Sequence, residues 1–434
     1  MNIPEKCDVA IIGGGPAGST AATMLAQKGY DVVLFDKVQH PRYQVGESLI
    51  PHFWKFCETT GVDKKIDEED FIVKSGGTII WDGIIRQVAF KDFGYKRPAL
   101  HIERDRFDYI LLEYAKESGA RVFENVMVRE AHIDDDVNRR SLTYRINEDQ
   151  SIGNISCRYV IDGSGQNALI SKQLGIREID PEFRFMSVWG YFKDSKYFAL
   201  DGKAYPASKI REMPPTTLVT STQGWGWSWH IPLRETTSVG LILPKDEMMS
   251  VKHSDEALEE YFLRKCKEIP YLNQLLESAD YEGNFHGMRD YSYRPKRLEG
   301  PGYFLCGDAA AFIDPIFSEG CLLAFYSAFL ASWAIDRSLK NPSSEKESRK
   351  VFASQFASKY EVGHALALPR YKWSSEISDF ARDSMKFTSL AEQELMHVVS
   401  KVTTRNQNFQ DLIQDKKNLM ITSDKFHVLE ELVI

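Results

Sequence analysis

Apolar runs separated by glycine-rich or polar turns make up the beginning of the chain. The run from Asp8 to Ile12 predicts a buried strand, and the composition of Ser19 to Lys28 predicts a helix that Gly29 stops. A second apolar run, DVVLFD, predicts another strand that ends in Asp36. This alternation of strand, tight turn, helix and strand is typical of an α/β fold.

A tryptophan-rich stretch, GWGWSWHIP at residues 224–232, places an aromatic residue at every second position. Because successive side chains of a strand point to opposite faces, the pattern predicts one β-strand that Pro232 ends. Taken alone, it is typical of a half-buried strand whose aromatic face packs in the core. The predicted aromatic face is Trp225, Trp227, Trp229 and Ile231, and the other face is Gly224, Gly226, Ser228 and His230.

The segment FLCGDAAAFIDPIFSEGCLLA predicts a strand from Phe304, then a loop, then a helix that starts near Gly320. The apolar stretch from Cys321 to Ile335 is too short to span a bilayer, and its Ala and Ser content predicts a buried, closely packed helix. From about Lys340 the chain becomes polar, which predicts a loop leading into a C-terminal helical segment.

Composition and charge limit the size of the fold and exclude some kinds of partner and site. The chain has 434 residues, of which 43% are hydrophobic, so it can bury a large core as one lobed unit or as two domains. A net charge of −8 argues against nucleic acid as a partner, because phosphates require clustered Lys and Arg. The six cysteines are dispersed without a C-x-x-C pair, which predicts neither a metal site nor a disulfide framework. The N-terminus lacks the pattern of a signal peptide, and we therefore expect a cytoplasmic location.

The first turn, GGGPAG, has the spacing of a dinucleotide cradle. Its first glycine permits a tight turn, its third lets the backbone approach a pyrophosphate, and its last lets helix and strand pack closely. The helix start would present N–H groups to anionic oxygens, and Asp36 lies where a carboxylate can bind a ribose hydroxyl. NAD and FAD both use such a cradle, and a glycine-rich turn without a ligand is the alternative. The predicted cradle residues are Gly13, Gly15, Pro16, Ala17 and Gly18.

Several segments together resemble the flavin-dependent halogenases, a branch of the FAD monooxygenases built like aromatic-ring hydroxylases. The resemblance covers most of residues 5–340, and the chain length is closer to the phenol or pyrrole type than to free-tryptophan halogenases. Lys74 in FIVKSGG and the WSWHIP strand are its most specific parts. The other matching parts are GGGPAG at 13–18, VGESLIP at 45–51, Arg104 with FDYILLEYA, DGSG at 162–165 and GDAAAFIDPIFSEG at 307–320.

The resemblance implies an α/β protein with a Rossmann-like FAD-binding domain, an antiparallel-sheet substrate domain and a C-terminal helical segment. The FAD-binding monooxygenase-like module would span residues 1–340, and the C-terminal helical region residues 341–434. Within the module, the FAD-binding parts would be about 1–75, 100–175 and 290–340, and the substrate-side sheet about 76–99 and 176–289.

The resemblance also implies contacts to FAD outside the cradle. Carboxylates would accept hydrogen bonds from hydroxyls, guanidinium groups would suit pyrophosphate or ribityl oxygens, and a helix start would face the flavin ring with its positive end. Asp308 as an ordinary helix cap and Arg104 as a solvated surface charge are the alternatives. The implied contacts are Asp36, Arg42, Ser48, Arg104, Asp308 and Gly320.

In the family, reduced FAD and O2 give a C4a-hydroperoxide, and chloride or bromide attacks it to release hypohalous acid. The resemblance implies that Trp227 and Trp229 separate the organic substrate from the flavin. Lys74 would capture or hydrogen-bond the oxidant and deliver electrophilic halogen, and Ser318 would hydrogen-bond the oxidant or Lys74. Burial would lower the pKa of Lys74, whereas the alternative is an ordinary surface lysine. The small residues on the other face of the tryptophan strand would leave room for a neighbouring strand or the flavin loop.

The family's halide site is a Ser-(Ser/Thr)-Gly turn whose backbone N–H groups bind the anion. Here that turn is Ser318-Glu319-Gly320, which implies a halide at Glu319 and Gly320. Glu319 departs from the family pattern, and its carboxylate would repel a halide unless it points outward or is neutral. Gln166 after DGSG is a second departure, because many relatives carry Arg there.

The chain shows no second dinucleotide fingerprint, so the resemblance implies a separate flavin reductase that supplies FADH2. The substrate would be an electron-rich aromatic, either a free small molecule or an acyl group tethered to a carrier protein. We expect no nucleic-acid partner, no membrane span, and a monomer or homodimer. Two alternatives stay open: an FAD-dependent hydroxylase or reductase of the same fold, and a non-catalytic flavin-binding partner protein.

Overall fold

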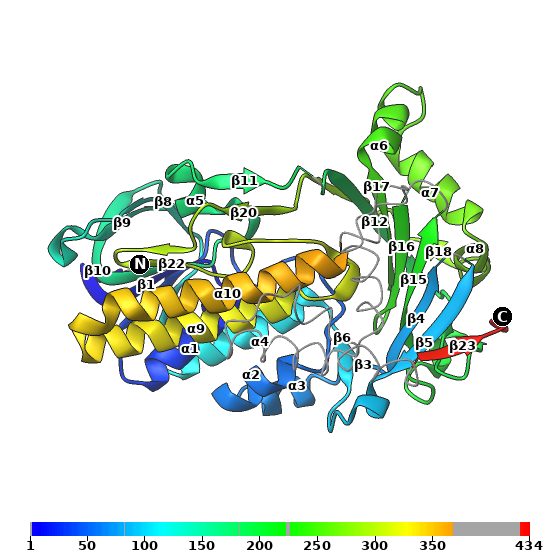
Figure 1. Ribbon diagram of the computed structural model, residues 1–434, viewed down its shortest axis with the longest axis horizontal. Coiled ribbons are helices and arrows are strands. Elements are labelled where there is room, and N and C mark those ends of the chain that lie inside the picture. The colour runs from blue at the N-terminus through cyan, green and yellow to red at the C-terminus, as the bar shows by residue number, and fades with distance from the viewer. Residues whose placement is uncertain (1, 82, 182, 223–225, 368–425) are drawn as a thin grey trace.

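Two large β-sheets form the two ends of the molecule in the computed structural model, and long helices run alongside the first of them (Figure 1). The structure describes residues 2–81, 83–181, 183–222, 226–367 and 426–434. The predicted α/β architecture, with a nucleotide-binding type of sheet and a second sheet, is confirmed.

The first sheet has eight strands and a parallel centre in the order β22-β10-β1-β2-β7. β21 pairs antiparallel at one edge, and β8 and β9 pair antiparallel beyond β10. The strands are β1 (Lys6–Ile12), β2 (Val32–Phe35), β7 (Arg121–Phe123), β8 (Val126–His132), β9 (Ser141–Ile146), β10 (Ile152–Asp162), β21 (Glu299–Gly300) and β22 (Tyr303–Leu305).

Helices cover one face of this sheet. α9 packs against α1, and α10 runs beside α9, as the yellow and orange ribbons of Figure 1 show. The predicted small-residue packing of the apolar helix is confirmed, since its alanines lie in the same core cluster as β1 and β22. The helices of this end are α1 (Pro16–Gln27), α2 (Phe53–Thr60), α3 (Asp63–Glu68), α4 (Arg104–Glu117), α5 (Leu169–Gln173), α9 (Gly320–Lys340) and α10 (Glu345–Ala367).

The turn between β1 and α1 depends on glycine. A Cβ on Gly18 would lie 1.9 Å from the carbonyl oxygen of Gly13, so only glycine lets the helix pack this closely on the strand. α1 begins at Pro16, three residues before the predicted start, because the fixed φ of proline suits the first position of a helix. The predicted second strand is β2, and Asp36 follows it directly.

The second sheet has nine strands, and its main path is β18-β12-β17-β16-β15-β4-β5-β23. The pairings are antiparallel except for β4 with β15, which run parallel, so the expected antiparallel sheet contains one parallel pair. The strands are β4 (Gly76–Trp81), β5 (Ile84–Ala89), β12 (Phe185–Lys193), β15 (Thr216–Thr222), β16 (Gly226–Pro232), β17 (Thr237–Pro244), β18 (Asp280–Tyr281), β19 (His286–Arg289) and β23 (Phe426–Leu429).

Helices α6 (Lys245–Lys252), α7 (Leu258–Glu268) and α8 (Pro270–Leu275) lie beside the second sheet in Figure 1. Their apolar side chains cluster with Val239, Leu241 and Leu243 of β17, which alternate onto one face of the sheet. Short two-stranded pairings complete the fold: β3 (Ile72–Lys74) with β6 (Ala99–His101), β11 (Arg177–Ile179) with β20 (Tyr293–Pro295), and β13 (Tyr197–Phe198) with β14 (Ala204–Tyr205).

The predicted tryptophan strand is β16, which lies between β15 and β17. The strand is buried on both faces rather than half-buried, because it is central and both faces of the sheet are covered there. A Cβ on Gly226 would lie 1.8 Å from the carbonyl oxygen of Ile242, so its small size admits the neighbouring strand. Gly224 and Trp225 lie outside the described residues.

The C-terminal part of the chain reaches both sheets. α10 starts at Glu345, and β23 pairs antiparallel with β5 at the edge of the second sheet. The rest of the predicted helical region, residues 368–425, lies outside the described residues. Within the described residues, none of the helices has the length and apolar character needed to cross a bilayer. The described residues also contain no cluster of His, Cys, Asp and Glu that could hold a metal ion.

Close packing of Trp229 on the neighbouring strand gives a test of this fold. Trp229 pairs with Gly240 of β17, and a Cβ on Gly240 would lie 2.1 Å from its indole ring. We therefore expect Gly240→Ala to lower the free energy of unfolding by about 1–3 kcal/mol through overpacking. The control is Gly77→Ala on β4, where a Cβ would be 3.9 Å from its nearest neighbours. Denaturant unfolding checks both variants, and equal effects would contradict this packing.

Candidate active site

A cavity of about 630 Å³ lies between the two sheets and is lined by residues of both. The turn after β1 contributes one part of its wall, and the aromatic face of β16 contributes another. The start of α9 contributes a third. Segments far apart in the sequence therefore meet around one space, and its size suits a large organic cofactor.

Four of the five predicted cradle residues line this cavity: Gly13, Gly15, Pro16 and Ala17. Gly18 is not among the lining residues, and it serves the packing of α1 on the turn. A Cβ on Gly13 would lie 2.3 Å from the carbonyl oxygen of Gly163, which follows β10. The glycines thus let two strand ends and a helix start converge.

Asp36 lines the cavity and holds the turn at the same time. One of its carboxylate oxygens accepts a hydrogen bond of 2.6 Å from the backbone N–H of Gly14. Burial opposes ionisation of Asp36, but hydrogen bonds from His40, Val38 and Gly14 outweigh it and lower the pKa of the carboxyl. The group is therefore an anionic acceptor at neutral pH.

Arg42 and Arg104 both line the cavity and share one counter-ion, Asp108. Asp108 is fully buried, accepts hydrogen bonds of 2.9 and 3.0 Å from Arg104, and lies 3.0 Å from the guanidinium of Arg42. Arg104 also donates to the carbonyl oxygen of Val45. Burial opposes the charge of Arg104, but Asp108 more than offsets this and raises its pKa. Arg104 is therefore a buried, paired cation and not a solvated surface charge.

Asp308 lies in a short 3₁₀ turn, Gly307–Ala309, after β22 and lines the cavity. Burial raises the pKa of its carboxyl to about 6, against the opposing charge of Arg104 and with a further contribution from Asp108. Gly307 also lines the cavity and has a φ of +57°, which favours glycine. A half-buried acid next to such a turn can accept hydrogen bonds from ligand hydroxyls.

Lys74 ends β3 and is buried, with 4% of its surface exposed. Its Nζ donates hydrogen bonds of 3.0 Å to Ser48 Oγ and to the carbonyl oxygen of Leu49. Ser318 Oγ donates to the same Ser48 hydroxyl at 3.1 Å. Ser48 and Ser318 line the cavity, and Lys74 is not among its lining residues. One layer of hydroxyl groups therefore separates the lysine nitrogen from the cavity.

The hydroxyl layer extends to two residues that sequence reasoning did not single out. Thr217 Oγ1 lies 3.1 Å from Ser48 Oγ and 2.7 Å from His101 Nε2. Burial and the charge of Lys74 lower the pKa of His101 well below its usual range, so the ring is neutral. Since Lys74 can only donate, Ser48 accepts from it and is free to donate to Thr217. The contact with Thr217 orients the hydroxyl of Ser48, which in turn accepts a hydrogen bond from Lys74.

Trp227 and Trp229 line the cavity, with ring centroids 5.9 Å apart. Trp189 of β12 packs against this wall, since its ring lies 6.4 Å from that of Trp229, but it is not among the cavity-lining residues. The wall and the glycine cradle face the same cavity, as expected. Trp189 lies on a different strand, and its contribution was not visible in the period-two pattern of the tryptophan strand.

A second hydrogen-bond chain includes Tyr43 and Glu47, which line the cavity. Trp189 donates to Tyr43 at 2.6 Å, the hydroxyls of Tyr43 and Tyr191 are 2.9 Å apart, and Tyr191 donates to Glu47. Burial raises the pKa of Glu47. These residues also escaped the sequence analysis, although Glu47 stands inside the VGESLIP segment.

The three consecutive residues of the turn at 318–320 contact different parts of the protein. Ser318 has a φ of +57° and points its hydroxyl to Ser48, whereas Gly320 begins α9 and lines the cavity. Glu319 is buried and forms an ion pair of 3.1 Å with Lys359 of α10. The carboxylate therefore points neither to solvent nor to an uncharged partner, and sequence reasoning missed Lys359 because no local signal marks it.

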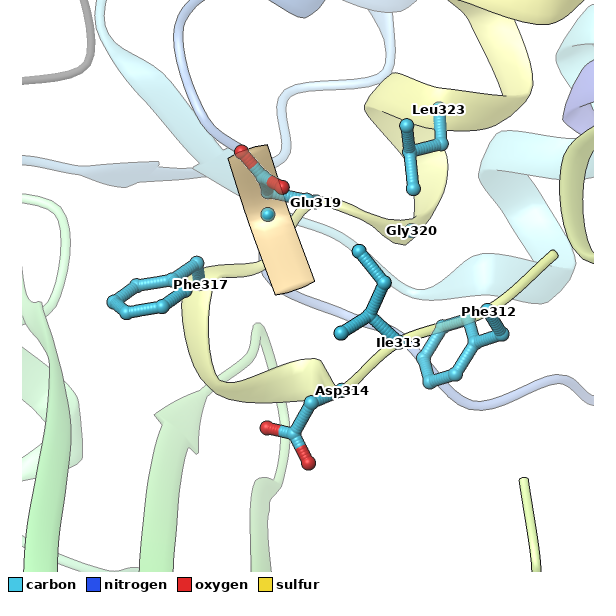
Figure 2. A pocket seen from close by; sticks show the side chains of 8 residues that line it. Phe312, Ile313, Asp314, Phe317, Glu319, Gly320 and Leu323 are labelled. Carbon is cyan, nitrogen blue, oxygen red and sulfur yellow. The ribbon is translucent and has the colours of Figure 1, made fainter. Parts of the chain in front are cut away.

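A small cavity of about 10 Å³ lies beside this turn (Figure 2). Gly320 lines both this cavity and the large one. Figure 2 shows the side chain of Glu319 extending away from that of Asp314, which lies at the other side of the loop. Asp314 accepts a hydrogen bond from the backbone N–H of Ile316 and so fixes the loop before α9.

The residues around the large cavity fit FAD. The N-terminus of α1 has no side-chain cap, so its N–H groups are available to a pyrophosphate, and the nearby Gly13 and Gly18 have no room for a Cβ. The carboxyl groups of Asp36, Glu47 and Asp308 and the guanidinium groups of Arg42 and Arg104 line the same cavity. When bound there, FAD would supply redox chemistry, and the chain would supply the donors, acceptors and walls around it.

Comparisons with known proteins agree with this fit. The model of the FAD binding domain family matches residues 6–347. The chain is 33% identical over 389 residues to the flavin-dependent halogenase armH1 of Armillaria mellea, covering 85% of this chain and 72% of that protein. It is 33% identical to the 1H-pyrrole-2-carbonyl-[peptidyl-carrier protein] chlorinase of Pseudomonas fluorescens, covering 79% of this chain and 78% of that protein.

The fold is also similar to a solved structure. The myxobacterial chondrochloren halogenase CndH superimposes with a TM-score of 0.77 at 26% identity, covering 96% of this chain and 95% of that chain.

Asp108 gives a test of the site's electrostatics. We expect Asp108→Asn to lower the free energy of unfolding by about 3–5 kcal/mol, because it leaves the buried guanidinium of Arg104 without its counter-ion. The control is Glu117→Gln on the same helix, which breaks an exposed pair with Lys65 and should cost less than about 1 kcal/mol. Denaturant unfolding measures both. Similar losses in the two variants would contradict the assignment of Asp108 as the key counter-ion.

Proposed function

The chain belongs to the FAD-binding flavin-dependent halogenases, and from this premise we propose how its residues carry out the reaction. The enzyme uses reduced FAD, O2 and chloride or bromide to make hypohalous acid, and it halogenates an electron-rich aromatic substrate. The observation that carries this proposal is the buried nitrogen of Lys74, which donates to Ser48, a residue that lines the large cavity and also accepts a hydrogen bond from Ser318.

FAD would be held in the large cavity. The N-terminus of α1 would bind its pyrophosphate, and Asp36 and Asp308, which line the cavity, would accept hydrogen bonds from its hydroxyl groups. Arg42 and Arg104 place positive charge beside it, and their shared partner Asp108 fixes them. Gly18 supports this site through packing on Gly13, and Ser48 through its bonds to Lys74 and Ser318.

The halide would bind at the start of α9, where Gly320 lines the cavity and the backbone N–H groups of a helix N-terminus favour an anion. The side chain of Glu319 is not a halide ligand in this proposal, because it is paired with Lys359. Ser318 lies between the halide and Ser48, so the oxidant formed at this turn meets the hydroxyl layer in front of Lys74.

Lys74 donates a hydrogen bond to hypohalous acid and so polarises it toward the substrate: the carbon–halogen bond forms as the oxygen–halogen bond breaks, and the ring proton leaves with the hydroxide as water. Its ammonium donates hydrogen bonds to Ser48 and Leu49, so these groups set the direction in which the nitrogen points. Trp227 and Trp229 keep the organic substrate away from the cofactor while small inorganic species pass. The neutral ring of His101 adds no further positive charge to the neighbourhood of the amine.

The substrate is a phenolic or pyrrole group, either free or tethered to a carrier protein. The similarity to a chlorinase named for a carrier-bound pyrrole supports the tethered form. The similarity to a flavin-dependent halogenase whose name mentions no carrier protein is compatible with a free substrate. Reduced FAD comes from a separate flavin reductase, which fits the single dinucleotide cradle of the sequence.

Lys74 gives the direct test of the proposed reaction. We expect Lys74→Ala to lower the yield of halogenated product by about 10²–10⁴-fold while FAD affinity stays within about twofold, because the amine acts on the oxidant and not on the cofactor. The assay combines reductase, chloride or bromide, and a panel of free phenols and carrier-bound acyl groups, with products detected by mass. The control is Lys91→Ala, which removes an exposed lysine near β5. Undiminished halogenation by Lys74→Ala, or hydroxylated product from the wild type, would refute the proposal.

Asp308 predicts a pH dependence of FAD binding. Its pKa of about 6 in the free protein should fall when a cofactor hydroxyl donates to the carboxylate, so binding releases a proton. FAD affinity should then increase by up to about tenfold per pH unit as pH rises toward 6 and level off above it. Fluorescence titration from pH 5 to 8 measures this, and Asp308→Asn should remove the dependence. A slope that persists in Asp308→Asn would exclude Asp308 as its source.

A further inference from the structure

Glu319 places a carboxylic acid at the start of α9, next to the glycine that lines the FAD cavity. The side chain is buried, with 8% of the residue's surface exposed. A lone carboxylate here would oppose the partial positive charge of the helix start and repel any anion bound to its N–H groups. The position therefore needs a compensating charge if the turn is to bind a halide.

Lys359 supplies that charge from a different element. Its Nζ lies 3.1 Å from a carboxylate oxygen of Glu319, and only 2% of the residue's surface is exposed. The two residues are 40 positions apart, so the pair joins α10 to the start of α9. Both side chains are largely removed from water, so this ion pair offsets part of the cost of burying each charge.

Gly363 shapes the same face of α10 for the carboxylate. It stands one helical turn after Lys359, and residues four apart on a helix share a face. A Cβ at this position would lie 2.8 Å from the second carboxylate oxygen of Glu319. Glycine is disfavoured inside helices, so its presence here has a packing reason. α10 thus accommodates Glu319 in two ways: Lys359 provides a positive charge, and Gly363 leaves room for the carboxylate.

Among the described residues, two neighbouring ionisable groups, His52 and Asp314, do not supply this positive charge. Burial and the charges of Lys359 and Lys55 lower the pKa of His52 to about 4, so this histidine is neutral at pH 7. Asp314, on the loop before α9, carries the same sign as Glu319 and would add to its effect on an anion.

We propose that Lys359 is a positioning residue that cancels the charge of Glu319 and so keeps the start of α9 able to bind halide. This inference rests on the proposed function of that turn. Lys359 does not touch the halide. It acts through Glu319, and the C-terminal helix α10 thereby becomes a required part of the halide site.

The test compares bromide binding by the FAD-loaded protein and its variants. Sodium bromide is titrated at constant ionic strength, and the visible absorbance of bound FAD reports the dissociation constant. The variants are Lys359→Met, Glu319→Gln and the double variant. The control is Lys65→Met, which removes a lysine from the exposed pair with Glu117. The bromide KM for product formation is the second readout.

Lys359→Met should raise the bromide dissociation constant by about tenfold or more, because it exposes the halide to an uncompensated carboxylate. Glu319→Gln should lower the constant, since it removes the negative charge beside the turn and keeps the positive charge of Lys359. The double variant should return to within about threefold of the wild type, and Lys65→Met should match the wild type. A merely structural pair predicts something different, namely weaker binding in both single variants.

Weaker binding in both single variants, or equal effects of Lys359→Met and Lys65→Met, would overturn the inference. If Lys359→Met does not fold, Glu319→Gln is compared with Glu319→Gln/Lys359→Gln, and the inference requires tighter bromide binding by the first. A wild type that shows no bromide effect on its spectrum or product would instead overturn the proposed halide site itself. The wild-type measurement thus distinguishes failure of the proposed function from failure of this inference.

Discussion

The conformation of one turn, residues 318–320, controls how the site is organised. Ser318 has a left-handed backbone, and this geometry directs its hydroxyl to Ser48 while Gly320 begins α9 at the cavity wall. Between them, Glu319 reaches back to Lys359. The turn therefore connects the cofactor cavity, the hydroxyl layer in front of Lys74 and the C-terminal helix. A shift of this backbone would disturb all three together.

Burial makes the ionisable groups of the site depend on specific partners. Asp108 holds Arg42 and Arg104, and Lys359 holds Glu319, because a charge removed from water is costly unless it is paired. Lys74 donates hydrogen bonds to the hydroxyl of Ser48 and the carbonyl oxygen of Leu49. Ser48 lines the cavity, so an incoming oxidant can compete for its contact with the lysine nitrogen.

The sequence predicted the parts of the site that local patterns encode. The glycine spacing identified the turn after β1, the period-two tryptophans identified β16, and the apolar run located α9 near its observed start. Asp108, Thr217, His101 and Lys359 could not be assigned in this way, because their partners lie on other elements and only the tertiary fold brings them together. The unexpected burial of both faces of β16 has the same origin, since helices and the other sheet cover it. From the sequence alone, Glu319 was expected to repel a halide, because its counter-ion Lys359 is 40 positions away along the chain.

The location of a bound halide tests this account most directly. Anomalous diffraction from crystals of the FAD-loaded protein soaked in bromide would reveal the anion without reference to turnover. The account predicts a bromide at the backbone N–H of Gly320, on the cavity side of the turn and separated from Lys74 by the hydroxyls of Ser48 and Ser318. Full FAD occupancy with bromide found only at surface lysines, or bound to Lys359 in place of Glu319, would contradict it.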